Sequence, residues 1–187
     1  MMKNVLKKSA AMAVLLGAFS LGSIPPLKAM SLGMGGSLIQ TTPYDYKMNE
    51  AGVLATYFPA YRTETAENLF MRAKSIRYVS DSLSHDHWQS PSETEALWAG
   101  DCEDKAIWLY AQLKRSGFHD VRLVVGRYRS IDRGYHVWVT VADAQSGNLF
   151  LLDSTAQKRI WKSVDFSNKL YKPLFSFDGI DRYRHEE

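Results

Sequence analysis

The sequence predicts an α+β fold, because helical and strand-like hydrophobic periodicities occupy different parts of the chain. Apolar residues recur at helical spacing between residues 64 and 113. After Gly117 the pattern changes to short runs rich in β-branched and aromatic residues, separated by turn signals. Such runs joined by short turns indicate an antiparallel meander. With 45% hydrophobic residues among 187, the chain can bury a core, and one folded domain is expected.

Residues 1–29 have the pattern of a secretory signal peptide. Three lysines precede an apolar run over residues 10–21, and a cleavage site is expected after Ser23 or Ala29. The run is short for a bilayer, so membrane contact is expected only through this transient segment. Its removal takes four of 23 basic and none of 20 acidic residues, leaving a nearly neutral protein. This argues against a nucleic-acid-binding surface and favours a periplasmic or secreted protein.

Residues 30–47 are rich in Gly, Ser, Thr and Met, and we interpret them as a linker or flexible arm before a domain over residues 48–187. The first helix of that domain is expected over Glu64–Tyr78, with Thr63 as a cap. The polar segment that follows, residues 79–90, contains a His-x-His motif with nearby aspartates. It fits a transition-metal site or a solvated loop, and the sequence leaves both open.

A second, short helix is expected to begin at a capping-box pattern, Ser92 to Glu95, and to end before Gly100. A third follows at once, with an apolar face that ends near residues 116–117. The only cysteine of the chain, Cys102, falls in its first turn, and the sequence alone also allows it to be a small buried hydrophobe.

The surroundings of Cys102 act on its thiol in opposite directions. Unpaired backbone N–H groups and the helix dipole favour the thiolate, whereas the negative charges of Asp101, Glu103 and Asp104 disfavour it. The acids must therefore be engaged elsewhere. Asp101 and Asp104 can form a capping box, and a hard cation such as Ca²⁺ is the other way to neutralise the cluster.

A thiol nucleophile needs a base and a group that orients the base, and two strand residues fit these roles. In the run Tyr135–Ala142, His136 shares a face with Trp138 and Thr140, opposite three valines. A four-residue hairpin loop over residues 144–147 would pair residues whose numbers sum to 291. Asp153 would then lie diagonally across from His136, within reach of its ring. A slip of one residue would move Asp153 to the other face.

These stretches together resemble the transglutaminase-like cysteine peptidase superfamily, including bacterial periplasmic proteases that clip surface adhesins. The resemblance covers roughly residues 78–155, and four stretches carry it: Trp88-Gln89-Ser90-Pro91-Ser92-Glu93-Thr94, Gly100-Asp101-Cys102-Glu103-Asp104-Lys105-Ala106, Tyr135-His136-Val137-Trp138 and Leu152-Asp153-Ser154. Lys105 departs from the family, since adhesin-cleaving members commonly have an aromatic residue there.

The resemblance implies a papain/transglutaminase-like fold, with the cysteine-bearing helix packed on an antiparallel sheet. It implies Cys102 as nucleophile, His136 as general base and acid, and Asp153 as the residue that orients His136. It also implies calcium bound by acids that flank the cysteine, here Asp101, Glu103 and Asp104. No organic cofactor is expected, the substrate would be a protein or peptide at the cell envelope, and a regulatory partner protein is compatible with the family.

The expected reaction is hydrolysis of a peptide or amide bond through a thioacyl-enzyme. The oxyanion would be held by the Cys102 backbone N–H and by a second donor, for which the upstream pair Trp88 and Gln89 is favoured over Trp98. Two alternatives remain. One is a protein-crosslinking transglutaminase, in which an amine replaces water at the same site. The other is a non-catalytic, calcium-stabilised binding module of the envelope.

Overall fold

The computed structural model describes residues 35–54, 64–82, 86–129, 134–143, 148–162 and 170–185. Residues 31–187 form one compact unit of α+β class, and the predicted signal segment over residues 1–29 lies outside the described residues. Within the described ranges, none of the helices combines the length and apolar character needed to cross a bilayer.

Helices and strands occupy largely different parts of the chain, and most of the helices precede most of the strands. In chain order they are β1 (Ser37–Ile39), α1 (Asp45–Glu50), α2 (Ala66–Ser75), β2 (Arg77–Tyr78), α3 (Pro91–Leu97), β3 (Ala99–Gly100), α4 (Cys102–Arg115), β4 (Val121–Tyr128), β5 (His136–Ala142), β6 (Leu149–Leu152), β7 (Trp161–Lys162), β8 (Tyr171–Asp178) and β9 (Asp181–Arg184).

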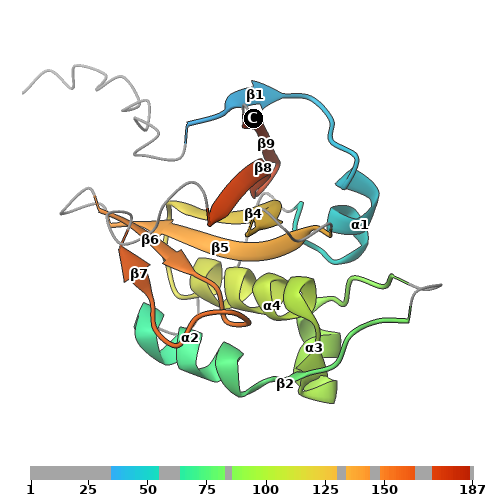
Figure 1. Ribbon diagram of the computed structural model, residues 1–187, viewed down its shortest axis with the longest axis vertical. Helices are drawn as coiled ribbons and strands as arrows, with labels where there is room; N and C mark the ends of the chain where they lie inside the picture. The colour runs from blue at the N-terminus through green and yellow to red at the C-terminus, as the bar shows by residue number, and fades with distance from the viewer. Residues whose placement is uncertain are drawn as a thin grey trace, which may run out of the picture. The chain divides into compact units, whose positions relative to one another are not determined.

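The main sheet is antiparallel and is covered by helices on one face (Figure 1). Its strand order is β1-β9-β8-β4-β5-β6-β7, and β2 and β3 form a separate parallel pair. Helix α4 lies under β4 and β5, and α2 and α3 pack against α4 (Figure 1). The main core fills the space between these layers and includes Trp108, Leu109, Val139 and Phe177. The predicted antiparallel sheet with the cysteine-bearing helix packed on it is thus confirmed.

The hairpin register agrees with the prediction. Strands β5 and β6 pair Val139 with Leu152 and Ala142 with Leu149, so paired numbers sum to 291. Val137, Val139 and Val141 face the helices, while Trp138 lies in a second cluster on the other face. The residues expected to form the hairpin loop, 144–147, lie outside the described part of the chain.

The N-terminal arm and two helix caps differ from the predictions. From residue 35 on, the predicted arm over residues 30–47 belongs to the fold: Ser37–Ile39 pair with β9, and α1 begins at Asp45. The sequence of this Gly/Ser-rich stretch does not predict a strand, because its backbone pairs with a segment at the far end of the chain. Helix α2 is capped by Thr65. The capping box of α3 is formed by Ser90 and Glu93, two residues before the expected one. Thr63 lies outside the described residues.

The aromatic residues near the C-terminus lie on both faces of the main sheet. Phe175 and Phe177 pack on the helix side, whereas Trp161 and Tyr171 lie on the opposite face. The reason is a bulge in the β4–β8 ladder: Val125 pairs with Phe175, but Gly126 already pairs with Pro173. One extra residue on β8 reverses which side chains point to each face. Phe166 lies outside the described residues.

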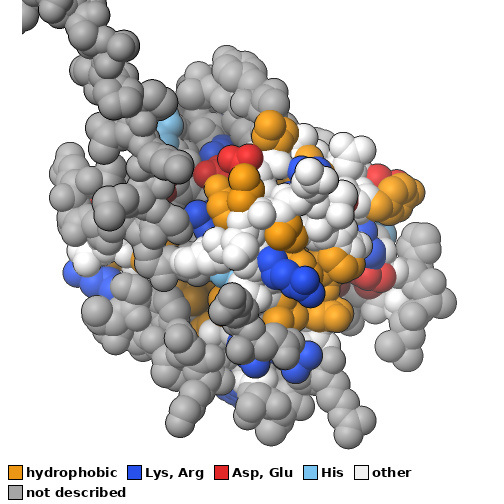
Figure 2. Space-filling model, turned by 90° about the horizontal axis from the view of Figure 1, so that it is seen from above, with side chains coloured by type: hydrophobic (Ala, Val, Ile, Leu, Met, Phe, Trp, Pro, Cys, Tyr) orange, Lys and Arg blue, Asp and Glu red, His pale blue; other side chains and the backbone are white. Residues whose placement is uncertain are grey.

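The face seen from above, over β1, β8 and β9, mixes hydrophobic side chains with Lys and Arg (Figure 2). Strand β9 contributes Arg182 and Arg184, and Arg122 of β4 lies 3.9 Å from the ring centroid of Tyr183. A cluster of acidic side chains lies around the start of α4, where the site described next is built.

Candidate active site

Cys102 is the first residue of α4 and is half-buried. Asp101 is the N-cap residue, and Asp104 completes the turn because its Oδ2 accepts the Asp101 backbone N–H at 3.2 Å. Gly100 makes this close turn feasible: a Cβ at this position would lie 2.5 Å from the Cβ of Asp104. The cysteine is therefore held at a helix N-terminus by this turn. Position 100 of the turn has no room for a residue larger than glycine.

The sulfur of Cys102 lies beside the backbone of β5. In this strand, Ala142 donates its N–H toward β4 and Asp143 donates toward β6. Because these directions alternate along an antiparallel strand, the N–H of Val137 also points to the β6 side. Pairing with β6 ends at Val139 and Leu152, so none of the described strands pairs with this N–H. This N–H instead acts on the Cys102 thiol and lowers its pKa.

His136 precedes Val137, and its imidazole is fixed by Asp153. The His136 Nε2 lies 2.7 Å from Asp153 Oδ2, as the predicted register required. The other carboxylate oxygen of Asp153, Oδ1, accepts the backbone N–H groups of Thr155 and Ala156, each at 2.9 Å. With Nε2 engaged, the ring has Nδ1 left for a proton from a neighbouring group. His136 and Asp153 thus form a pair, and His136 directly precedes Val137, whose N–H acts on the Cys102 thiol.

Asp153 is ionised in this environment. Burial of the carboxyl group would raise its pKa, but the hydrogen bond and charge of His136 and the backbone donors outweigh burial and lower the pKa of Asp153 below its usual value. A carboxylate with donors on both oxygens can orient an imidazole and stabilise the imidazolium that forms when the ring takes a proton.

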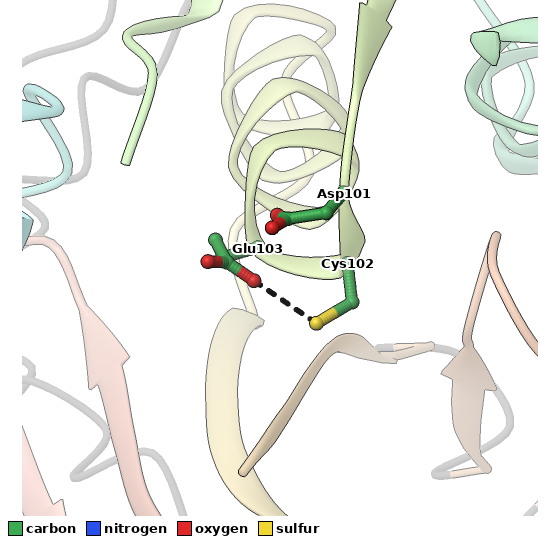
Figure 3. Close-up of side chains that lie close together, drawn as sticks. All are labelled: Asp101, Cys102 and Glu103. Atoms are coloured by element: carbon green, nitrogen blue, oxygen red, sulfur yellow. Dashed lines mark hydrogen bonds between the residues drawn. The ribbon is translucent and has the colours of Figure 1, made fainter. Parts of the chain in front are cut away.

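The thiol, in contrast, is protonated and hydrogen-bonded to an acid. Cys102 Sγ donates to Glu103 Oε2 at 3.0 Å, with Asp101 alongside (Figure 3). Burial first, and then the negative charges of Glu103 and Asp101, raise the pKa of Cys102, while the hydrogen bond from Val137 opposes the shift. Burial is the largest cause, and the raising effect that the sequence predicts for the acids adds to it.

The acids around Cys102 form a cluster whose members come from two segments. Carboxylate oxygens of Asp81, Asp86 and Glu103 lie within 4.8 Å of one another, and ligand atoms of Asp101, Cys102 and Glu103 form a second such group. Burial raises the pKa of Glu103 to about 9, helped by its hydrogen bond with Asp101. Asp101 Oδ1 is buried and has no hydrogen-bond partner within the described part of the chain.

This cluster fits a calcium ion. Ca²⁺ takes six to eight oxygen ligands, largely carboxylates, and the unpartnered Asp101 Oδ1 and the converging oxygens of Asp81, Asp86 and Glu103 are of that kind. Asp104 differs from the prediction because its oxygens are engaged: Oδ1 accepts the Gln89 backbone N–H at 2.8 Å, and Oδ2 accepts that of Asp101. It supports the turn, and Asp81 and Asp86 take its place in the candidate set.

The two expected oxyanion donors, Trp88 and Gln89, differ in whether their side chains already form a hydrogen bond. The indole Nε1–H of Trp88 donates to Asp86 Oδ1 at 3.2 Å, so this group is committed to the acidic cluster. The side chain of Gln89 is not bound to the acidic cluster in this way: its acceptor Oε1 is buried without a hydrogen-bond partner among the described residues, and its Nε2 would be the donor to an oxyanion. Trp98 ends α3 in a left-handed conformation and packs edge-on against Trp108. Gln89 remains the side-chain candidate.

The fold is similar to solved structures of a bacterial protein. LapG from Legionella pneumophila, treated with EGTA, superposes with a TM-score of 0.57 at 20% identity, over 76% of this chain and 75% of that one. The calcium-bound form of the same protein gives 0.55 at 21% identity, over 76% and 80%. The fold of this chain is similar to that of LapG. No protein-family model and no curated protein matches the sequence.

The contribution of Asp81 and Asp86 to the acidic cluster around Glu103 was not predicted from the sequence. Both lie in the segment whose His-x-His motif drew attention to a transition metal, yet His85 is outside the described residues and His87 is exposed, 3.6 Å from Glu93. The signal was available in the same segment, as two aspartates five residues apart just upstream of an acidic helix N-terminus. Their proximity to Glu103 depends on how the segment folds back, which composition does not show.

Proposed function

We propose that this protein is an exported cysteine peptidase that cleaves peptide or amide bonds through Cys102, His136 and Asp153. One observation carries the proposal: His136, whose Nε2 lies 2.7 Å from a carboxylate oxygen of the buried Asp153, directly precedes the strand residue whose N–H acts on a half-buried cysteine at a helix N-terminus. A thiol, a base and an orienting group in this order are the requirements for nucleophilic catalysis.

In the proposed reaction, His136 Nδ1 takes the proton of Cys102, and the sulfur attacks the carbonyl carbon of the substrate. The Val137 N–H stabilises the thiolate, and Asp153 stabilises the imidazolium. The Cys102 backbone N–H and the Gln89 amide would hold the oxyanion, each contributing on the order of 3 kcal/mol. His136 then gives its proton to the leaving amine, the C–N bond breaks, and water attacks the thioacyl-enzyme to release the acid.

The thiol must first leave Glu103, and calcium accounts for this. We propose that Asp81, Asp86, Asp101 and Glu103 hold a Ca²⁺ ion, which supplies positive charge that neutralises these carboxylates. Glu103 would then no longer accept the Cys102 hydrogen, and the thiol would be free to face His136. The likeness to a protein whose structure has been determined with calcium bound supports this part of the proposal.

The proposed location is the periplasm or the cell exterior, and the substrate is a protein of the cell envelope. The leader-like pattern of residues 1–29 supports export. The resemblance to adhesin-clipping peptidases supports a protein substrate, and a regulatory protein partner belongs to the same proposal.

The test is a search for new protein N-termini. Cell-envelope extract is incubated with wild-type protein or with Cys102→Ala, each with calcium or with chelator, and new termini are identified by mass spectrometry. We expect termini that appear only with wild type and calcium. His136→Ala should lose nearly all of this activity, and Asp153→Asn should lose less. Equal cleavage by Cys102→Ala would exclude the proposed nucleophile.

Two companion measurements separate the alternatives. Incorporation of a labelled amine into a glutamine peptide, in place of ammonia release alone, would identify a transglutaminase. If no new termini appear, the rate of Cys102 alkylation by iodoacetamide is compared between wild type and His136→Ala. Equal rates, together with a wild-type protein that calcium stabilises against unfolding, would indicate a binding module instead of an enzyme.

A further inference from the structure

Tyr171 shares an acceptor with His136. Its hydroxyl donates to Asp153 Oδ2 at 2.9 Å, the same oxygen that lies 2.7 Å from His136 Nε2. Tyr171 is fully buried and comes from β8, separated by β4 from the strand that bears His136. Asp153 thus receives four hydrogen bonds, two backbone N–H groups on Oδ1 and two side chains on Oδ2.

The β4–β8 bulge is what brings Tyr171 to Asp153. Without the extra residue, Tyr171 would point to the helix side together with Phe175 and Phe177. With it, Tyr171 pairs with Tyr128 and points to the face of His136. Gly126, opposite His136, permits the arrangement, because a Cβ there would lie 2.2 Å from the Lys172 carbonyl oxygen and 2.5 Å from the Trp138 indole. Bulges that re-aim side chains occur next to active sites.

Aromatic side chains enclose this hydrogen-bond network. The ring of Tyr171 lies 4.8 Å from that of Tyr128 and 5.3 Å from that of Trp138, and both of these rings also contact His136, at 5.4 Å and 6.1 Å. Burial first, and then the negative charge of Asp153, raise the pKa of Tyr171, so its hydroxyl stays a donor. The phenol takes one lone-pair position of Oδ2, and the imidazole must use the other.

We propose that Tyr171 is a positioning residue that acts through Asp153 to fix the place and orientation of the His136 ring. The proposal deepens the proposed function, on which it rests. By donating to the same oxygen, the Tyr171 hydroxyl limits the imidazole to one acceptor direction between Tyr128 and Trp138. That direction also determines where Nδ1 points, and the proposed function requires Nδ1 to take the proton of Cys102.

Tyr171→Phe tests the proposal, with Tyr110→Phe as the matched control. Tyr110 is also fully buried, and its hydroxyl also makes a short hydrogen bond, at 2.8 Å to the Gly179 N–H, but on the helix side of the sheet. Both variants lose one buried hydroxyl, so the unfolding midpoint in urea checks that they are comparably folded.

Two readouts are measured on the purified protein with calcium. The first is the His136 Nε2–H signal in ¹H–¹⁵N NMR spectra, assigned by its loss in His136→Gln, and its exchange with water. The second is the rate of Cys102 alkylation by iodoacetamide at one fixed pH. In Tyr171→Phe we expect about tenfold faster exchange and about tenfold slower alkylation, as for loss of one hydrogen bond to a charged group. Tyr110→Phe should match wild type in both.

The outcomes are distinguishable. If both readouts of Tyr171→Phe stay within about twofold of wild type, or if Tyr110→Phe changes them equally, the positioning role is overturned and Tyr171 only packs. If the NMR signal changes as expected but wild type and His136→Gln are alkylated at the same rate, Tyr171 positions His136 while the proposed Cys–His chemistry fails.

Discussion

Two buried carboxylates flank the cysteine and histidine, and their environments are opposite. Asp153 is 1% exposed and receives four donors, and its pKa is lowered despite burial. Glu103 is 8% exposed, its neighbours are Asp101 and the Cys102 thiol, and burial raises its pKa to about 9. Burial opposes ionisation in both cases, so the difference lies in what the protein itself supplies.

The comparison divides the site into two halves. In the finished half, around Asp153, the protein itself balances the buried charge, and in the unfinished half, around Glu103, it does not. On the Asp153 side, backbone and side-chain donors balance the charge, and the arrangement needs nothing from outside. On the Glu103 side, acids face acids, and the balance comes from a proton or from a bound cation. The predictions below test this difference, from the largest expected effect to the smallest.

Replacing Asp153 with alanine should have the largest effect on stability. The change leaves His136, Tyr171 and two backbone N–H groups without their acceptor, and breaking a buried pair in this way costs about 3–5 kcal/mol. Urea unfolding measures the free energy, and Asp120→Ala, at an exposed aspartate, is the control. A loss below about 1 kcal/mol would show that the Asp153 network contributes little.

Replacing Glu103 with glutamine should have the opposite sign when calcium is absent. The variant removes a buried group that resists ionisation, so the unfolding free energy in chelator should rise by about 1 kcal/mol at neutral pH. The same variant should lose most of the stabilisation that calcium gives the wild type. A thermal or urea titration with and without calcium reads both effects, and an unchanged calcium response would remove Glu103 from the cation site.

The pH dependence of stability should also differ between the two halves. The folded pKa of Glu103 is about 9, above the ordinary 4.5, so the folded state binds this proton more tightly and loses stability as pH rises through that window. Asp104, raised to about 6 by burial, adds loss at the lower end. Asp153 acts in reverse, since its lowered pKa gives stability that is lost as pH falls below its ordinary 3.8.

Unfolding midpoints in chelator should therefore decline from weakly acidic to alkaline pH, and saturating calcium should flatten the decline. Because a cation needs ionised carboxylates, the gain from calcium should be larger at alkaline than at acidic pH. A calcium-independent pH profile would contradict the assignment of Glu103 and Asp101 to a cation site.

The smallest effect is expected at Lys47. This lysine of α1 pairs with Asp86 and donates to the Asp86 carbonyl oxygen at 2.9 Å, so it competes with a cation for that carboxylate. Lys47→Gln should raise the affinity for calcium about threefold, in line with the modest strength of an exposed ion pair. Calorimetric titration measures this, with Lys114→Gln, whose partner is Asp178, as the control. Weaker calcium binding would show that Lys47 supports the site.

The finished half was largely predictable from the sequence. The alternation of His136 and its valine neighbours, together with hairpin length, determined the register that brings Asp153 to the imidazole. The turn at Gly100 and the apolar stripe placed Cys102 at the start of α4. These are local patterns, or patterns between strands adjacent in the chain, and local periodicity carries them.

The remaining parts depend on contacts between distant segments. Tyr171 contacts Asp153 because of a bulge in the β4–β8 ladder, which no residue pattern predicts. Asp81 and Asp86 lie close to Glu103 only because their segment folds back toward α4. The pairing of β1 with β9 joins opposite ends of the described chain. Trp88 was a reasonable donor by position, but its N–H is directed to Asp86.

The hydrogen bond from Val137 to the cysteine has a consequence for mutational tolerance. The donor is a main-chain group exposed by the early end of the β5–β6 ladder. A deep mutational scan that selects for function should therefore find position 137 permissive to other β-branched residues, and intolerant of proline, which has no N–H. Exchange among β-branched residues at this buried position should then keep the same electrostatic support for the sulfur.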